Sequence, residues 1–247
     1  MSFLEHLIDL RKRIIYSAVA IAVGTVAGFT VADRVSGFIV RPMQEALRGR
    51  GLEDKLIYTS PTGYLSLLIT MGVYIGIVLA APVVLYQVWL FIAPGLYRNE
   101  RRAVTGFVFF SFLLFLLGIA FGYFVMLPYM LAFLIGFQGP FTPLISINEY
   151  FHFILIVLLG LGLIFEIPVL IFFFALFNIV TPAFLWRNVR YAILIIAIVA
   201  AIITPTPDAT TMLVFMAPMI ALYFVGIAVA AVVVHRKAKA SAAEGRP

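Results

Sequence analysis

An apolar run of 25 residues, 153–177, most strongly constrains what this chain can fold into. As a helix it would be roughly 37 Å long, enough to cross a hydrocarbon core of about 30 Å. One carboxylate, Glu166, interrupts the run, and Pro168 follows two residues later. An acid at that depth should face protein or water, because exposure to lipid is costly. Pro168 removes a helix hydrogen bond, so we expect a kink near the acid.

The composition extends this conclusion to the whole chain. Of the 247 residues, 64% are hydrophobic and 11% are charged, and the mean hydropathy is +1.13. A soluble domain has about a quarter of its residues charged. Long unbroken apolar runs favour helices over a barrel, whose strands would alternate with a period of two. The sequence therefore predicts an all-α membrane protein, and its scattered cations argue against nucleic-acid binding.

Six apolar stretches predict six transmembrane helices. They cover about residues 14–31, 64–92, 104–127, 153–180, 189–203 and 209–234. The fifth stretch would make only roughly 22 Å of helix, well short of the bilayer core. Such a short span implies local thinning of the membrane or shelter by neighbouring helices.

The polar segments are expected to connect these helices. The longest, residues 33–63, contains a possible short amphipathic helix at 39–47 and an extended piece at 56–60. We place Pro128 in a loop after the third span. Residues 1–235 are predicted to form a single domain, followed by a disordered cytoplasmic tail at 236–247.

The distribution of Lys and Arg predicts the orientation in the membrane. Of the 17 cationic residues, 12 fall in one set of loops and termini, and the other five all lie in residues 33–63. Cytoplasmic loops carry the excess of cations. Both termini are therefore predicted to be cytoplasmic.

The motifs of catalytic sites are missing. The sequence has no phosphate-binding Gly-rich loop, no zinc-protease motif and no nucleophile elbow. Its three histidines lie too far apart in the chain to suggest a metal site by their spacing. We therefore expect no enzyme activity, no cofactor and no metal.

Three acidic residues have both a local and a functional interpretation, and a fourth has a local one. Glu166 is either a buried acid bonded to a neighbouring span or a polar group for a ligand or a proton. Asp9 and Glu100 lie at the predicted membrane edge among arginines, where Asp9 can pair with Arg13 and Glu100 can favour the start of span three. They could instead receive a partner's arginines through bidentate hydrogen bonds. Asp208 is expected to cap the last helix.

Five sequence blocks together resemble the TatC family, the multispanning receptor of the twin-arginine protein translocase. The blocks are HLIDLRKR (6–13), PVVLYQVW (82–89), FIAPGLYRNERR (91–102), FEIPV (165–169) and TPTPD (204–208). The resemblance runs from about residue 3 to 234. Five blocks in this order are far more specific than any single motif.

The resemblance implies a function in protein export across the prokaryotic cytoplasmic membrane. TatC-like proteins bind the twin-arginine signal peptides of folded precursors, self-associate, and work with small single-span subunits of the TatA and TatB types. The proton-motive force drives this export. The family also has six helices, both termini inside, and short fifth and sixth spans, and the region around helix five resembles the docking surface for the partner subunits.

The resemblance also assigns roles to particular residues. The implied signal-peptide-binding residues are Asp9, Arg11, Arg13, Glu100 and Arg101. Glu166 matches an intramembrane polar group. The implied periplasmic cap includes Pro42 and Asp208.

This chain departs from the family pattern at three places. Asp9 is one methylene shorter than the Glu common there, Gly63 stands where the family often has Glu, and Thr70 is near the place of a frequent Lys. Two other functions remain open from the residues alone. One is a secondary transporter with Glu166 as its proton carrier, and the other is a purely structural scaffold.

Overall fold

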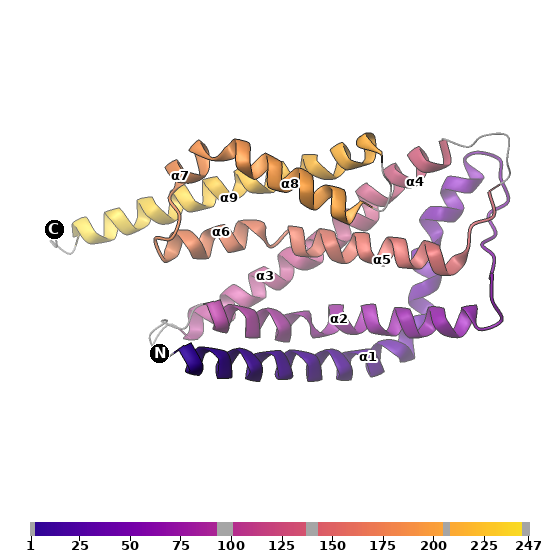
Figure 1. Ribbon diagram of the computed structural model, residues 1–247, viewed down its shortest axis with the longest axis horizontal. Helices are drawn as coiled ribbons and strands as arrows, with labels where there is room; N and C mark the ends of the chain where they lie inside the picture. Colours follow the sequence, from indigo (N-terminus) through magenta and orange to yellow (C-terminus); the bar gives the residue numbers. More distant parts are fainter. Residues whose placement is uncertain (1–2, 93–100, 137–142, 205–207, 244–247) are drawn as a thin grey trace. The chain divides into compact units, whose positions relative to one another are not determined.

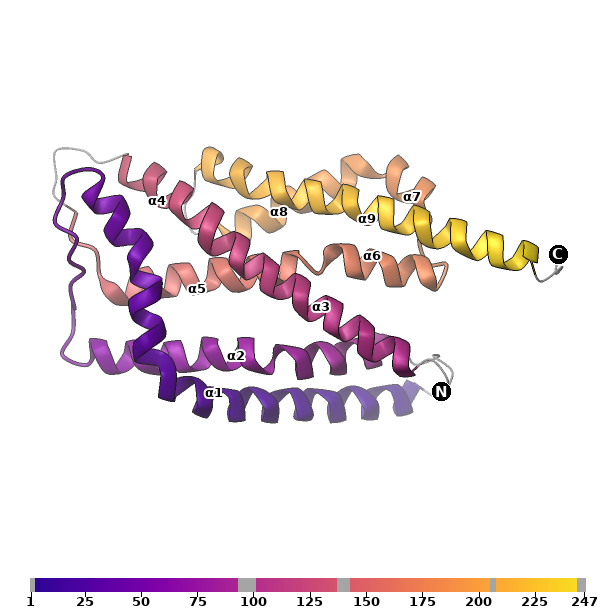
Figure 2. The ribbon, with the colours of Figure 1, turned by 180° about the vertical axis from the view of Figure 1, so that it is seen from behind.

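The computed structural model describes residues 3–92, 101–136, 143–204 and 208–243, and these residues are mostly helical (Figures 1 and 2). The helices are α1 (Phe3–Arg48), α2 (Gly63–Ile92), α3 (Arg101–Phe121), α4 (Leu127–Gly136), α5 (Ile147–Ile164), α6 (Ile167–Leu176), α7 (Pro182–Arg187), α8 (Val189–Ile203) and α9 (Ala209–Ala243). A π-helical turn, Gly122–Met126, joins α3 to α4. The predicted all-α class is confirmed.

Five helical segments are long and apolar enough to cross a membrane, and α8 is a shorter apolar helix. The five are Glu5–Arg48, Gly63–Phe91, Gly106–Gly136, Ile147–Leu176 and Ala209–Lys237. The fifth of the six predicted spans is therefore short, as expected. The expectation of a short sixth span is wrong, because its apolar segment has 29 residues. Lys and Ala are strong helix formers, and α9 continues to Ala243 through residues expected to be disordered.

The chain divides into two compact units. The first contains Met1–Leu113 and Leu127–Leu155, and the second contains Leu114–Met126 and Ile156–Pro247. The expectation that residues 1–235 form a single domain stays a prediction.

In the first unit, α1 is one helix of 46 residues. The separate helix predicted at 39–47 and the loop expected from residue 33 are therefore wrong, since α1 continues through Pro42. The Tyr150 hydroxyl donates a 2.8 Å hydrogen bond to the Ile39 carbonyl. This bond joins α5 to α1 three residues before Pro42, where proline disturbs the helix hydrogen bonds. Figures 1 and 2 show that α1 runs beside α2 and then changes direction.

Glycines allow α1 and α2 to pack closely. Gly24 and Gly28 lie one turn apart on α1, opposite Gly72 and Gly76 on α2. A Cβ atom at Gly24 would lie 2.5 Å from the Gly76 carbonyl oxygen, and one at Gly28 would lie 2.5 Å from that of Gly72. The backbones therefore meet at a distance that only glycine permits, as in many membrane helix pairs.

The third span is longer than predicted. Pro128 lies inside the continuous helical segment Gly106–Gly136 rather than in a loop. The preceding π-helical turn explains this difference, because local π adjustments accommodate proline in membrane helices. Residue 57 pairs with Ser146 in an isolated bridge, which agrees with the extended piece expected at 56–60.

In the second unit, α6, α7 and α8 all pack against α9. The Tyr223 hydroxyl of α9 donates a 2.8 Å hydrogen bond to the Leu185 carbonyl of α7. Near the other end of α9, the Lys237 ammonium donates to the Leu176 carbonyl and, at 3.3 Å, to Asn178 Oδ1. A cation stabilises this carboxyl end of α6 because the last helix carbonyls are unpaired.

Candidate functional site

Glu166 lies where the fourth span is broken. It follows the last residue of α5 by two positions and caps the amino end of α6, with Pro168 in the first turn. The Glu166 amide donates to the Leu163 carbonyl at 3.1 Å, which is a tighter turn than an α-helix makes. Pro168 has no N–H to continue the α-helical pattern. The kink expected from the sequence is confirmed and amounts to a break between two helices.

The Glu166 residue is 5% exposed. Its neighbour Phe165 is buried as well. The acid therefore faces protein rather than lipid, as the cost of a carboxylate in hydrocarbon requires. Its carboxylate does not cap the first turn of α6, so it is directed toward other groups.

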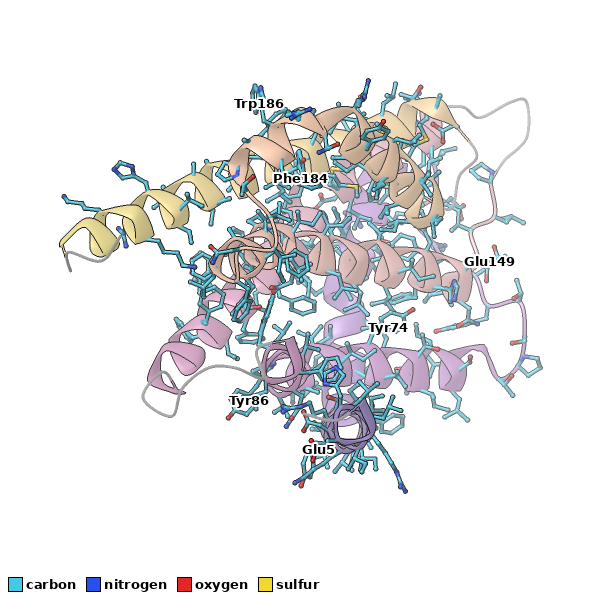
Figure 3. All side chains as sticks on the ribbon, turned by 60° about the vertical axis from the view of Figure 1, so that its left-hand side comes forward. Glu5, Tyr74, Tyr86, Glu149, Phe184 and Trp186 are labelled. Carbon is cyan, nitrogen blue, oxygen red and sulfur yellow. The ribbon has the colours of Figure 1, made fainter. Side chains whose placement is uncertain are left out.

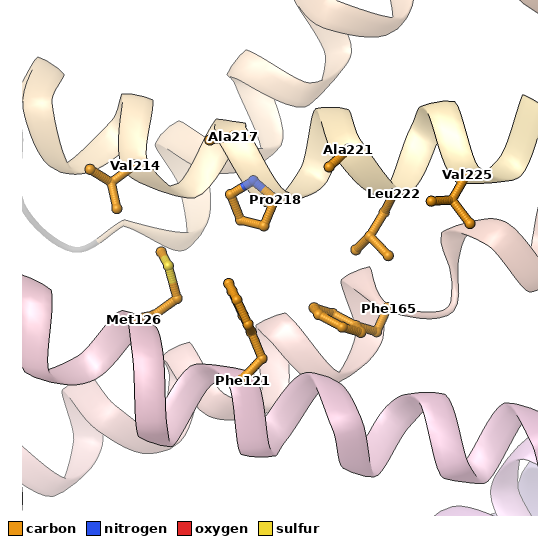
Figure 4. A pocket seen from close by; sticks show the side chains of 9 residues that line it. All are labelled: Phe121, Met126, Phe165, Val214, Ala217, Pro218, Ala221, Leu222 and Val225. Carbon is orange, nitrogen blue, oxygen red and sulfur yellow. The ribbon is translucent and has the colours of Figure 1, made fainter.

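Phe165 also lines an apolar pocket of about 500 Å³ in the second unit. Figure 4 shows Phe121 and Phe165 facing Pro218 of α9. The α9 side of the pocket is formed by residues at helical spacing, Val214, Ala217, Pro218, Ala221, Leu222 and Val225. The pocket offers no charged side chain, so it suits an apolar segment.

At the amino end of α1, Asp9 and Arg13 form the predicted ion pair. Arg13 Nε lies 2.6 Å from Asp9 Oδ2, and the side chains of Arg13 and Asp9 are 18% and 30% exposed. Arg11 is exposed on the same helix. The His6 ring stacks on Phe91 at a centroid distance of 4.5 Å, which joins this end of α1 to the end of α2.

The other site residues of the sequence analysis have different outcomes. Glu100 lies outside the described residues, and Arg101 is described only as the first residue of α3. Asp208 caps α9 as predicted, since its Oδ1 accepts a 2.6 Å hydrogen bond from the Thr211 amide. Pro42 is buried within α1 rather than in a loop. The roles of these residues in a periplasmic cap or in signal binding stay predictions.

No sequence pattern predicts the pocket face of α9 or the contact of Lys237 with α6. The pocket face repeats at helical spacing, but α9 is apolar on all sides there, so its pattern has no polar contrast. Lys237 lies in the segment 236–247, which the sequence predicts to be a disordered tail. Lys237 and Asn178 are 59 residues apart, so the local sequence does not predict their contact. Only the packing of α6 on α9 brings the two residues together.

Comparisons with known proteins give a consistent result along almost the whole chain. The family model described as "Sec-independent protein translocase protein (TatC)" matches residues 5–218. The chain is 49% identical to a TatC from Koribacter versatilis over 237 residues, covering 96% of this chain and 87% of that protein. It is 36% identical to TatCy from Bacillus subtilis, covering 99% and 94% of the two chains.

A solved structure gives the same result at the level of the fold. The chain superposes on the crystal structure of the twin arginine translocase receptor TatC with a TM-score of 0.80. The two are 34% identical, and the superposition covers 93% of this chain and 99% of the other. The shared fold therefore covers nearly the whole length of both chains.

Proposed function

Since the chain belongs to the TatC family of Sec-independent protein translocase proteins, we propose that it is the signal-peptide receptor of a twin-arginine translocase. It is a multi-pass protein of the bacterial inner membrane and a translocase component rather than an enzyme. In the proposal it works with single-span subunits of the TatA and TatB types and uses the proton-motive force. The similarity to a solved twin arginine translocase receptor is the observation that carries this proposal.

Carboxylates at the amino end of α1 and before α3 supply the recognition chemistry. Asp9 already holds a guanidinium group at 2.6 Å, which supports its ability to receive an arginine of the signal. Glu100 is proposed to bind the second arginine, and Arg11, Arg13 and Arg101 complete the set of residues proposed to bind the signal. Charge-assisted hydrogen bonds of this kind are worth about 1.5–3 kcal/mol each.

The apolar part of the signal is proposed to enter the pocket beside Phe165. Its apolar lining matches such a segment, and its volume of about 500 Å³ admits several side chains. A peptide entering an apolar region must still pair its backbone polar groups. Glu166, buried next to Phe165, supplies a polar group for that purpose.

Binding of a twin-arginine signal peptide tests the proposal directly. The full chain in detergent should retain a signal peptide with Arg-Arg and release the Lys-Lys variant, because lysine cannot bind a carboxylate bidentately. Glu100→Gln and Glu100→Ala should weaken crosslinking to the Arg-Arg peptide at least tenfold. The exposed Glu53→Gln variant has the same loss of charge and should bind as the unaltered chain does.

Two results would overturn this function. Equal retention of the Arg-Arg and Lys-Lys peptides would favour a structural scaffold. Uptake of a small solute that Glu166→Gln abolishes would favour a secondary transporter.

A further inference from the structure

The end of α7 and the start of α8 form an exposed corner that combines aromatic rings with arginines. We define this α7–α8 corner by Phe184, Trp186, Arg187, Arg190 and Tyr191. The three aromatic residues are 56%, 64% and 52% exposed, in sequence order. Figure 3 shows Trp186 directed away from the ribbon. In membrane proteins, exposed Trp and Tyr side chains are enriched at the level of the lipid headgroups.

Local contacts hold this corner in one conformation. Thr181 Oγ1 accepts a 3.2 Å hydrogen bond from the Phe184 amide, and the Asn188 side chain donates a 2.8 Å bond to the Phe184 carbonyl. Leu185 is buried, and the Trp186 ring lies 5.9 Å from the Phe224 ring of α9. The exposed groups are therefore positioned before any ligand binds, which lowers the entropic cost of binding.

The corner carries positive charge that is not neutralised nearby. Between residues 156 and 243 the only acidic residues are Glu166 and Asp208. Asp208 caps the opposite end of α9, about 24 Å along the helix from Phe224. Within the described part of the chain, neither Arg187 nor Arg190 forms an ion pair.

The short length of α8 places these arginines where a lipid phosphate is the available anion. With 15 residues, α8 is about 22 Å long, and the adjacent α9 remains apolar from Val225 to Val234. Trp186 contacts Phe224, and α9 stays apolar for ten residues beyond Phe224. Cations at this level of α9 require that headgroups or water approach them. Guanidinium groups bind phosphate through paired hydrogen bonds.

We propose that the α7–α8 corner binds the headgroup of an anionic phospholipid. Arg187 and Arg190 hold the phosphate and the second negative group, while the aromatic rings lie against the glycerol and upper acyl region. The exposed residues Leu194, Ile195, Ile198 and Ile202 of α8 continue the apolar surface for the acyl chains. A single-span partner protein would also fit the apolar face of α8, but it would leave Arg187 and Arg190 without the anion that a phospholipid headgroup supplies.

Fluorescence of Trp186 tests this proposal in the complete chain. The protein has two tryptophans, and the other one, Trp89, is only 2% exposed. Full-length Trp89→Phe protein is reconstituted in phosphatidylcholine vesicles that contain a small fraction of either dibrominated phosphatidylglycerol or dibrominated phosphatidylcholine. Each arginine should enrich the anionic lipid roughly fivefold. The brominated anionic lipid should therefore quench Trp186 several times more strongly than the brominated zwitterionic lipid.

The variant Arg187→Gln/Arg190→Gln should reduce the ratio of the two quenching constants to about one. The matched control Arg236→Gln/Lys239→Gln removes the same charge from exposed positions on α9 and should leave the ratio unchanged. If Trp89→Phe does not fold, the same ratio is measured with Trp89 present. Equal quenching by both lipids, an unchanged ratio in the double variant, or no quenching of Trp186 because protein covers it would each overturn the proposal.

Discussion

At the scale of single residues, the best-defined interactions are local pairs of a carboxylate with a guanidinium. Asp9 and Arg13 lie one helical turn apart, and Arg48 Nε donates a 2.7 Å hydrogen bond to Asp54 Oδ2 in the loop that follows α1. Both pairs are partly exposed, so solvent screens their contribution to stability. Each pair instead holds a guanidinium group at a defined position beside a carboxylate.

The Arg48–Asp54 pair predicts a pH dependence. The hydrogen bond from Arg48 lowers the pKa of the Asp54 carboxyl below its ordinary value of 3.8. The stabilisation from this pair is fully present above the ordinary pKa and is lost as the pH falls through the lowered folded pKa. A carboxyl NMR titration should show the lowered pKa, and Arg48→Gln should raise it toward 3.8. An unchanged titration in that variant would contradict the assignment, and Glu53→Gln serves as the control.

Asp9 gives a second prediction at this scale. Asp9→Asn should lower the affinity for a twin-arginine signal peptide about tenfold, because one charge-assisted hydrogen bond of about 1.5 kcal/mol is lost. Asp9→Glu keeps the charge and extends the reach by one methylene, so it should bind at least as well as the unaltered chain. The affinity is measured by fluorescence anisotropy of a labelled peptide. Equal weakening by both substitutions would show that Asp9 acts through local packing instead.

At the scale of elements, glycine determines how closely α1 and α2 pack. Gly28→Ala should destabilise the protein by about 1–3 kcal/mol, because its Cβ would lie 2.5 Å from a backbone oxygen of α2. The matched control is Gly37→Ala in the same helix, where a Cβ meets nothing within 4 Å. That control should be neutral or slightly stabilising, since alanine favours a helix. Thermal unfolding in detergent distinguishes them, and equal midpoints would refute the close packing.

Lys237 should stabilise the junction between α6 and α9. Lys237→Met removes the donor to the Leu176 carbonyl and keeps a long side chain, so the end of α6 should open more often. Hydrogen exchange in peptides that cover residues 174–181 should become several times faster. Lys239→Met, at an exposed position nearby, should not change it. Identical exchange rates in both variants would show that Lys237 does not stabilise the end of α6.

At the scale of the whole molecule, the distribution of Lys and Arg predicts the orientation in the membrane. The absence of cysteine makes the chain a ready background for single-cysteine labelling. A cysteine at Ser60 should react with an impermeant maleimide added to whole cells, whereas one at Lys239 should react only after the membrane is opened. Both residues are exposed. Labelling of both in intact cells would contradict the predicted cytoplasmic carboxyl terminus.

The sequence by itself determined the features that depend on near neighbours in the chain. The break at Glu166 follows from Pro168, the cap of α9 from Asp208, and the ion pair of Asp9 from Arg13 one turn away. The long unbroken apolar stretches likewise predicted the all-α membrane fold, because only helices and closed barrels pair all backbone groups in hydrocarbon, and barrel strands would alternate with a period of two. Even the shortness of α8 could be read from its 15 residues.

Only the tertiary structure decided where helices continue past a proline and which apolar faces contact protein rather than lipid. The structure shows α1 continuing through Pro42, and the hydroxyl of Tyr150, 111 residues along the chain, donates a hydrogen bond to the Ile39 carbonyl nearby. A π-helical turn accommodates Pro128, and Lys237 of α9 donates a hydrogen bond to the Leu176 carbonyl at the end of α6. The pocket beside Phe165 had no sequence signal, because a membrane helix can be apolar toward lipid and toward protein alike. Contacts between distant segments, rather than the local pattern, select among these possibilities.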